Sequence, residues 1–405
     1  MTLNQETRAR CRRLDLHYIA MQAGFWAMFA AVCAYQTALL LGRGFSNSQV
    51  GLITAVRCLS GIFFQPALGG FADRHPQIPL KYIVTGSLGI SLLAGLCYLF
   101  FPGLGLGATL VIFVVIGGLE VSAYPLMDAM AVQFINDGVP IRYSLGRGIG
   151  SMSYAVVCVF LSLLVGRWGV ERTLIVHVLL VAVEIVLVGT YPPYRSKPRP
   201  AAEVQKPLSI PALLRRDPRF TLTLAGVLLG MTGVLPLSNF LVNVVVSRGG
   251  READLGFALF LMAGFELPTS FFFQRLLRRW GSARLLLISL VFCAFKAAAL
   301  LWAPSYGWVL LAQPLQMLGY GLFTPASVYF VNESVPEADR VRGQTVMMVA
   351  SNGLGGVLGS MLAGRTLDAG GADLMLACCG ACCCAGVLLC LAALYGGKKA
   401  TKDPA

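Results

Sequence analysis

The chain has 405 residues, of which 57% are hydrophobic and only 13% are charged, and its mean hydropathy is +0.72. Soluble domains carry about 25% charged residues, so this composition excludes an ordinary soluble protein and predicts an integral membrane protein. The formal net charge is +13, but the basic residues follow a membrane topology, so nucleic acid is not an expected partner.

Twelve apolar segments of about 20 residues follow one another along the chain, which is the length that crosses a bilayer as a helix. Hydrophobicity does not alternate within them, and lipid tolerates only helices and closed barrels, so we expect helices. The segments lie at 17–41, 49–71, 81–101, 106–133, 145–166, 173–191, 220–246, 254–275, 283–302, 307–331, 343–364 and 372–395. The polar, basic start of the chain lacks the pattern of a cleavable signal peptide and predicts a cytoplasmic anchor.

A stretch rich in proline and basic residues, 192–219, separates two halves, 1–191 and 220–405. Its prolines and charges predict a cytoplasmic linker that contains no regular helix. Each half holds six of the predicted spans, which predicts two six-helix bundles.

The two halves also share a pattern of residues. Pro66 precedes Asp73 by the same spacing with which Pro268 precedes Arg275, and further pairs recur at a similar offset. Duplicated six-helix halves are typical of transporters that bind substrate near the middle of the membrane, between the repeats.

Basic residues fix the orientation. If both termini are cytoplasmic, the cytoplasmic segments hold 23 of the 32 Lys and Arg residues and the external loops hold 6. This bias predicts a multi-pass protein of the inner (plasma) membrane with both ends in the cytoplasm. The chain has no GxxxxGK[ST] phosphate loop, so we expect no cofactor and an ion gradient as the driving force.

One cytoplasmic loop carries a family resemblance. The stretch FFQPALGGFADRHPQIPLKYI contains Gly69, Asp73 and Arg74 in a G-x-x-x-D-R pattern, and Lys81 follows. This pattern is similar to the signature between helices 2 and 3 of the major facilitator superfamily. The glycine would let two helices approach, and the charged pair would cap a helix end and bridge to the other half as a breakable gate.

The resemblance narrows to the lactose permease branch, the oligosaccharide–proton symporters, through stretches such as GFSNSQVGLI, YSLGRGIGSMSYA and FCAFKAAA. It implies an all-α membrane fold of twelve helices arranged as two pseudo-symmetric halves. It also implies a functional monomer in the lipid bilayer, with a small-molecule substrate and protons as its partners.

Ionisable residues inside spans are costly, at roughly 2.5–3.5 kcal/mol each for a central charge, and they usually serve function. The chain has seven of them: Arg57, Glu120, Asp128, Arg147, Glu184, Glu266 and Lys296. Counting from the cytoplasmic ends of their helices, Glu266 and Lys296 differ in depth by roughly 4–5 Å. We therefore expect this carboxylate and this ammonium group to pair.

The resemblance assigns roles to five residues. In the permease branch, an acidic residue on helix 4 and an arginine on helix 5 hold the sugar, and Asp128 and Arg147 match these positions. Tyr154 stands where an aromatic residue stacks on the sugar ring. Glu266 and Lys296 match a sugar-binding glutamate on helix 8 and a basic residue on helix 9.

Helix 10 departs from the permease pattern. Gln316 and Gly319 stand where the permease has its titrating residues. Another carboxylate must therefore carry a coupling proton, and we expect Glu266 first and Glu120 second.

The remaining ionisable residues, the cysteines and the paired glycines allow less specific predictions. Glu184 and His177 share one helix face and form either a proton relay or a pair at the lipid edge, whereas Arg57 has no predicted partner. The cysteines at 378–384 are expected to pack against neighbouring helices rather than bind a metal, because no second shell follows. The glycine pairs Gly146/Gly150 and Gly355/Gly359 predict close helix contacts.

The expected activity is proton-coupled symport of a small polar solute, a sugar or a sugar-like molecule such as a nucleoside, by alternating access. An exporter of drugs or metabolites with the same fold is the first alternative. A membrane solute sensor that does not transport is the second. No catalytic or metal-binding residues are expected.

Overall fold

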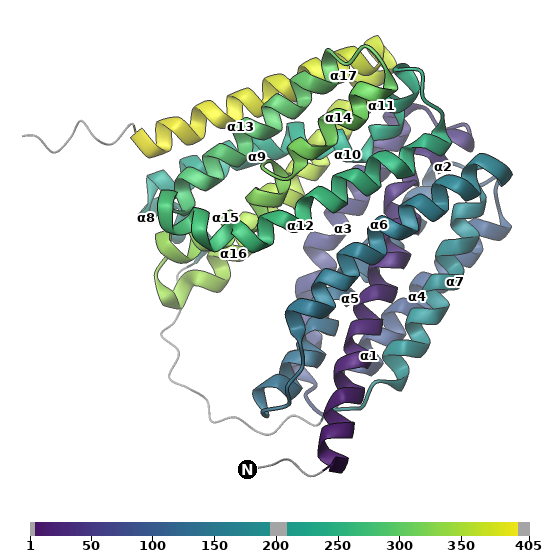
Figure 1. Cartoon of the computed structure of the whole chain (residues 1–405), viewed down its shortest axis with the longest axis vertical. Helices are drawn as coiled ribbons and strands as arrows, with labels where there is room; N and C mark the ends of the chain where they lie inside the picture. The colour runs from purple at the N-terminus through teal and green to yellow at the C-terminus, as the bar shows by residue number, and fades with distance from the viewer. Residues whose placement is uncertain (1–4, 195–208, 396–405) are drawn as a thin grey trace, which may run out of the picture. The chain divides into compact units, whose positions relative to one another are not determined.

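The computed structural model describes residues 5–194 and 209–395, and all regular structure within them is helical (Figure 1). The predicted all-α class is therefore confirmed. Among the described residues, nine helices are long and apolar enough to cross a membrane, so the predicted twelve are not matched one for one. One reason is that a single helical stretch, Glu337–Tyr395, includes two predicted spans.

The chain forms two compact units. The first comprises Met1–Phe45, Val56–Arg199 and Glu252–Gly264, and the second comprises Ser46–Ala55, Pro200–Arg251 and Phe265–Ala405. The proposed boundaries of the two halves and the linker remain a prediction.

The linker prediction was wrong in one respect. Residues 192–194 and 209–219 of it are described, Ile210–Arg216 forms the short helix α8, and α9 begins at Pro218. Pro211 lies in the first turn of this helix, where a missing N–H is tolerated. The remaining part, residues 195–208, lies outside the described residues.

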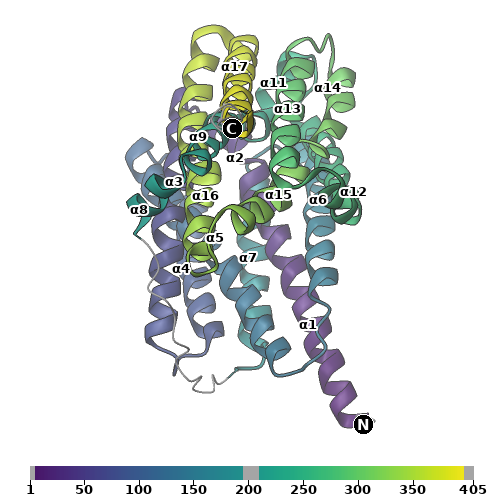
Figure 2. The same ribbon diagram turned by 90° about the vertical axis from the view of Figure 1, so that its left-hand side faces the viewer.

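The elements up to residue 190 are α1 (Gln5–Phe29), the π-helix η1 (Ala30–Ala34), α2 (Gln36–Gly42), α3 (Asn47–Arg74), α4 (Leu80–Phe100), α5 (Leu106–Asn136), α6 (Tyr143–Trp168) and α7 (Arg172–Thr190). Within the first unit, α1 runs beside α6 and α7, and α4 packs on α5 and α7 (Figure 2). A buried cluster that includes Tyr18, Met21, Phe25 and Met127 holds these helices together.

The later elements are α9 (Pro218–Val234), α10 (Pro236–Asn239), α11 (Leu241–Ser247), the 3-10 turn η2 (Glu252–Asp254), α12 (Leu255–Trp280), α13 (Ser282–Leu301), α14 (Tyr306–Ala312), the 3-10 turn η3 (Gln313–Gln316), α15 (Tyr320–Ser334), the 3-10 turn η4 (Glu337–Asp339), α16 (Arg340–Met348), the π-helix η5 (Val349–Leu354) and α17 (Gly355–Tyr395). Non-helical backbone at Gly370 and Gly371 kinks α17 between the two predicted spans that it contains.

Prolines fall inside corresponding helices of the two halves. Pro66 lies inside α3 and Pro268 inside α12, while Pro125 lies inside α5 and Pro325 inside α15. A proline inside a helix removes one backbone hydrogen bond and bends the helix. The repeat in the sequence is thus a repeat of prolines inside helices.

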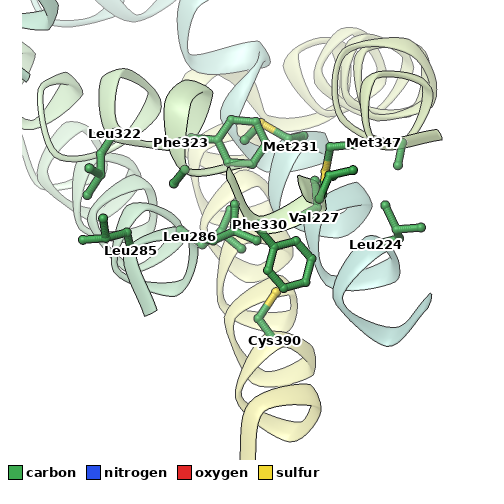
Figure 3. Packing of buried hydrophobic residues seen from close by; sticks show 14 of the residues in the cluster. Leu224, Val227, Met231, Leu285, Leu286, Leu322, Phe323, Phe330, Met347 and Cys390 are labelled. Carbon is green, nitrogen blue, oxygen red and sulfur yellow. The ribbon is translucent and has the colours of Figure 1, made fainter. Parts of the chain in front are cut away.

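The second unit is built on close contact between α9 and α17. A methyl group at Gly233 would collide with the backbone of Cys379, and one at Gly359 with the backbone of Thr232. Small residues at such contacts let membrane helices gain packing energy. Around this contact, a buried cluster joins Val227 and Met231 of α9 to side chains of α13, α15 and α17 (Figure 3).

Candidate functional site

Asp128 on α5 is held by three neutral donors. Its Oδ1 accepts hydrogen bonds from the Tyr18 hydroxyl at 3.1 Å and from Gln22 Nε2 at 2.9 Å, and its Oδ2 accepts one from the Tyr143 hydroxyl at 2.8 Å. The rings of Tyr18 and Tyr143 stack with their centroids 5.7 Å apart. These three bonds satisfy the carboxylate without a neighbouring cation.

The guanidinium of Arg147 on α6 lies against two aromatic rings. Its Cζ is 4.6 Å from the ring centroid of Tyr124 and 5.5 Å from that of Trp26, within the range of cation–π attraction. Among the described residues, no ion pair joins Arg147 to Asp128, and the buried Nη1 of Arg147 has no hydrogen-bond partner. Arg147 therefore keeps N–H groups for a further acceptor.

Two glycines of α6 set its distance from α1. A methyl group at Gly146 would collide with the ring of Tyr18, and one at Gly150 would collide with Trp26. The close contact predicted for this pair is confirmed. Tyr154 lies two turns beyond Arg147 on α6 and is half-buried, so both residues lie on one face of the helix.

Glu266 on α12 and Lys296 on α13 are linked through Gln316. The Lys296 ammonium donates to Gln316 Oε1 at 2.7 Å, and Gln316 Nε2 donates to Glu266 Oε1 at 2.9 Å. Lys296 is 3% exposed and Gln316 is 4% exposed. Among the described residues, this chain of three side chains replaces the direct pair that we expected, because one amide offers both an acceptor and a donor.

The backbone is irregular where Gln316 lies. Gln313–Gln316 is a 3-10 turn, and the backbone at Gly319 leaves the helical region before α15 begins. The carbonyl of Met317 instead accepts a hydrogen bond from Thr269 Oγ1 at 2.9 Å. Irregular backbone at membrane depth requires burial in protein or a cavity to line, and Gln313 and Gln316 are both buried here.

A second polar group lies in the core of the first unit. Glu120 on α5 is 1% exposed and accepts a hydrogen bond from Ser91 Oγ at 2.6 Å, and His177 Nε2 on α7 lies 3.2 Å from the same carboxylate oxygen. Arg57 on α3 donates to Cys33 Sγ of η1. The structure thus gives Arg57 a partner that the sequence did not suggest.

Glu184 lies on the same face of α7 as His177 but is not paired with it. The residue is 0% exposed, and neither carboxylate oxygen has a hydrogen-bond partner among the described residues. The space beside it exists because Gly24 on α1 has no side chain. The lipid-edge interpretation was wrong, since both Glu184 and His177 are buried.

The gate motif lies at the end of α3. Asp73 and Arg74 are exposed, and Arg74 is the last residue of the helix. No atom lies within 4 Å of a methyl group built on Gly69, so the expected close helix approach at this glycine is not seen. Lys81 instead caps the end of α7, where its ammonium donates to the carbonyls of Gly189 and Tyr191 at 3.0 Å each.

The buried cysteines of α17 pack against a neighbouring helix, as the sequence predicts. Cys379 and Cys383 are buried against Gly233, and Cys390 is buried against Gly226. Their sulfur atoms and backbone fill the space that the glycines leave. A helix contact therefore accounts for the buried cysteines of this run.

A cavity of about 400 Å³ opens elsewhere in the second unit, at the start of α9. Two of its acidic residues already serve structure, because Asp217 caps α9 through the amides of Arg219 and Phe220 and Glu333 accepts a hydrogen bond from Ser282. We therefore do not assign the solute to this cavity.

Sequence reasoning missed the neutral partners of the charged residues. Tyr18, Gln22 and Trp26 recur every four residues and so lie on one face of α1. That spacing of polar and aromatic residues inside an apolar helix is the signal that identifies them. From the sequence, Gln316 indicates only that a titrating residue is absent at this position. In the structure, its amide joins Lys296 to Glu266.

Comparisons with known proteins agree with the helical membrane fold. The family model described as "MFS_1 like family" matches residues 16–376. A maltose permease of Geobacillus stearothermophilus is 23% identical over 368 residues, which cover 89% of this chain and 88% of the permease.

Solved structures share the fold. The nucleoside transporter NupG superposes with a TM-score of 0.79 at 15% identity, over 95% of this chain and 99% of that one. A bacterial homologue of the human lysosomal transporter Spinster, in an inward-facing and occupied conformation, gives 0.70 at 15% identity, over 98% and 99%. The POT family transporter PepTSo gives 0.74 at 12% identity, over 94% and 97%.

Proposed function

The chain belongs to the MFS_1-like family of major facilitator transporters, and we propose that it is a proton-coupled symporter of a small polar solute. It is a membrane transporter rather than an enzyme. The solute that we propose is a sugar or a sugar-like molecule, nucleosides included. The similarity to a maltose permease and to a nucleoside transporter supports this class of solute.

One observation carries the proposal: the charged groups of Asp128, Glu266 and Lys296 are held by neutral groups rather than by each other. Asp128 is bound by two tyrosines and a glutamine, and Glu266 and Lys296 are bound by a shared amide. Neutral hydrogen bonds of this kind exchange readily with those of a hydroxyl-rich solute. The cationic groups of Arg147 and Lys296 would repel a lipophilic cation, the typical cargo of a drug exporter.

We assign solute contacts to five residues. Arg147 and Asp128 would hold vicinal hydroxyls through paired hydrogen bonds, and Tyr154 would stack on the ring of the solute. Glu266 and Lys296 would exchange their bonds to Gln316 for bonds to the solute. Arg147 supports this assignment most directly, because its buried Nη1 lacks a partner.

The proton would bind to Glu266 first. Releasing the solute changes the hydrogen bonds of this carboxylate, so protonation and solute binding are linked there. Glu120 is the second candidate. The driving force would be the proton gradient, with no cofactor.

We propose alternating access by a functional monomer in the inner (plasma) membrane, with both termini in the cytoplasm. The bias of basic residues supports this orientation. The motif at Gly69, Asp73 and Arg74 would act as a cytoplasmic gate, and its exposed charges are available for contacts that form and break during the cycle.

The test is uptake into proteoliposomes that contain the purified protein. Labelled sugars and nucleosides are offered with and without an inward proton gradient, and accumulation above equilibrium that needs the gradient is the expected result. Extrusion of lipophilic cations would instead identify an exporter. Solute binding without flux in either direction would identify a sensor.

A further inference from the structure

A buried histidine and a buried glutamate meet in the core of the first unit, away from the residues assigned to the solute. His177 on α7 is 0% exposed and Glu120 on α5 is 1% exposed. His177 Nε2 lies 3.2 Å from Glu120 Oε1, and Ser91 Oγ donates to that same oxygen at 2.6 Å.

The other ring nitrogen of His177 also faces an acceptor. Its Nδ1 lies 3.3 Å from the backbone carbonyl oxygen of Met28, at the end of α1. A carbonyl oxygen only accepts hydrogen bonds, and so does an ionised carboxylate. Both nitrogens of one imidazole therefore lie close to acceptors, Nδ1 in a hydrogen bond with Met28 and Nε2 within ion-pair distance of Glu120 but outside hydrogen-bond geometry.

This arrangement fixes a proton count. A neutral imidazole carries one N–H, which can satisfy only one of the two acceptors. Either the ring is an imidazolium, or its Nδ1 carries the hydrogen and Glu120 is protonated. In both cases the pair holds one proton more than a neutral histidine and a carboxylate together.

The charged neighbours favour a site that gains and loses this proton. Arg57 on α3 interacts electrostatically with Glu120, and Gly117 on α5 makes room for the arginine side chain. Two further titratable groups face Arg57: Cys33, which accepts a hydrogen bond from it, and Cys58. With Arg57 charged, the three residues Arg57, His177 and Glu120 are neutral together after the pair releases its proton. They carry one positive charge together when the pair holds it.

Both anchors of this cluster lie on one irregular part of the first helix. Met28 lies in the last turn of α1, two residues before the π-helix η1, and Cys33 lies inside η1. π-helical turns are rare and often lie at functional sites. Loss of the extra proton leaves one nitrogen of His177 facing an acceptor with no hydrogen between them, so either the Met28 contact or the Glu120 contact must open.

We propose that His177 and Glu120, with Ser91, form a proton-binding site whose loading controls the register of η1. This site is distinct from Glu266, and only its place in the transport cycle rests on the proposed function. Gln22 and Trp26, on α1 just before η1, contact Asp128 and Arg147. A change of register in η1 would therefore reach the solute contacts of the first unit.

Glu184 belongs to the surroundings of the site rather than to the site. It lies two turns from His177 on α7, about 10 Å along the helix axis, which is too far for direct proton transfer. Its carboxyl group has no partner among the described residues, and a buried carboxyl group without a partner is far more costly as an anion than as an acid.

The site is tested without any transport assay. The chain has only three histidines, so a His17→Asn/His75→Asn variant leaves His177 as the only source of histidine signals in nitrogen-15 NMR. An imidazolium is the expected result between pH 6 and 8. A neutral ring with hydrogen on Nδ1, together with an infrared carbonyl band of a protonated acid that disappears in Glu120→Gln, also supports the site. A neutral ring with hydrogen on Nε2, or a neutral Nδ1–H ring without that band, overturns it.

The role in the cycle is tested separately. Glu120→Gln and His177→Gln should each lower gradient-driven accumulation by about ten-fold while solute exchange at equal pH stays within about two-fold. Ser87→Ala is the matched control, because Ser87 lies one turn from Ser91 on α4, is also buried and donates to the carbonyl of Ile83 rather than to Glu120. Normal accumulation in both variants, with its loss only in Glu266→Gln, would remove the site from the cycle. If the wild type shows no proton coupling while the NMR result holds, the proposed symport fails and the proton site stands.

Discussion

Lys296 donates a 2.7 Å hydrogen bond to the side-chain carbonyl of Gln316, so a buried ammonium group is satisfied by a neutral amide. The same amide donates to Glu266 at 2.9 Å. One glutamine therefore satisfies two opposite charges that do not touch each other. Replacing the amide of Gln316 therefore removes a hydrogen bond from both charged groups at once.

Gln316→Leu should destabilise the protein by roughly 2–4 kcal/mol, because it leaves the buried ammonium of Lys296 and the half-buried carboxylate of Glu266 without their partner. Thermal unfolding of the detergent-purified protein measures the loss. Gln313→Leu is the matched control, since Gln313 lies in the same 3-10 turn, is also buried and bonds only the carbonyl of Val309. That variant should cost about 1 kcal/mol. Equal effects would show that Gln316 does not join the charges.

The sequence predicts the helices of this protein but not the hydrogen-bond partners of its buried charges, because different interactions determine them. The helices were predictable because the length of an apolar run and its lack of alternation decide them. The partners of the charges were not, because a depth estimate places Glu266 near Lys296 but does not show that Gln316 reaches between them. That contact depends on the broken backbone at η3, which an average helical rise cannot reproduce.

The first unit shows the same limit. Asp128 and Arg147 were correctly placed among the ionisable residues of the spans, but their partners lie on α1 and were not predicted. Glycines at Gly146 and Gly150 determine that approach. The sequence therefore indicated which helices come close, and only the structure shows which side chains meet there.

Arg147→Lys should weaken solute binding by about ten-fold or more while leaving the melting temperature nearly unchanged. A lysine has no planar group to lie against Tyr124 and Trp26 and cannot form paired hydrogen bonds. The measurement is the KM of uptake or the solute-induced thermal shift. Arg167→Lys is the matched control, because Arg167 stacks on Trp168 at the exposed end of the same helix. Unchanged binding in Arg147→Lys would remove the arginine from the site.

The two buried glutamates of the first unit should respond to substitution with opposite signs. Glu184→Leu should raise stability by about 1 kcal/mol, because the carboxyl group it removes has no partner among the described residues. Glu120→Leu should lower stability by about 2 kcal/mol, because it leaves Ser91 and His177 without their acceptor. Thermal melts of both variants, in one detergent, give the comparison. Destabilisation by Glu184→Leu would reveal a partner for that carboxyl group.

Two glycine substitutions, one at the close contact between α9 and α17 and one in open space, should change stability in opposite directions. Gly233→Ala should destabilise by about 1–3 kcal/mol, because the new methyl group meets the backbone of Cys379 and the sulfur of Cys383. Gly264→Ala has open space and should stabilise α12 by about 0.5 kcal/mol, since alanine restricts the unfolded chain. Unfolding in a denaturant series reports both values. A neutral Gly233→Ala would mean that the two helices separate easily.

Asp368, which lies between the predicted spans 343–364 and 372–395, gives a prediction about pH. Its Oδ1 accepts hydrogen bonds from the amide of Asn47 at 3.1 Å and from Asn47 Nδ2 at 3.0 Å, and its Oδ2 accepts one from the amide of Ser48 at 2.8 Å. Burial alone would raise the pKa of Asp368, but these bonds outweigh it and hold the pKa below its ordinary value.

A lowered pKa in the folded state means that the stabilisation by Asp368 is fully present above the ordinary pKa of an aspartate, about 3.9, and is lost only as the pH falls below it. Asp368→Asn should therefore lower the melting temperature by the same amount at pH 5 and at pH 8. Ser46→Ala is the control, because the Ser46 hydroxyl accepts the amide of Gln49 at the same helix start and does not contact Asp368. A difference that vanishes between pH 8 and pH 5 would show that Asp368 takes up a proton in that range, which contradicts three hydrogen bonds to an ionised carboxylate.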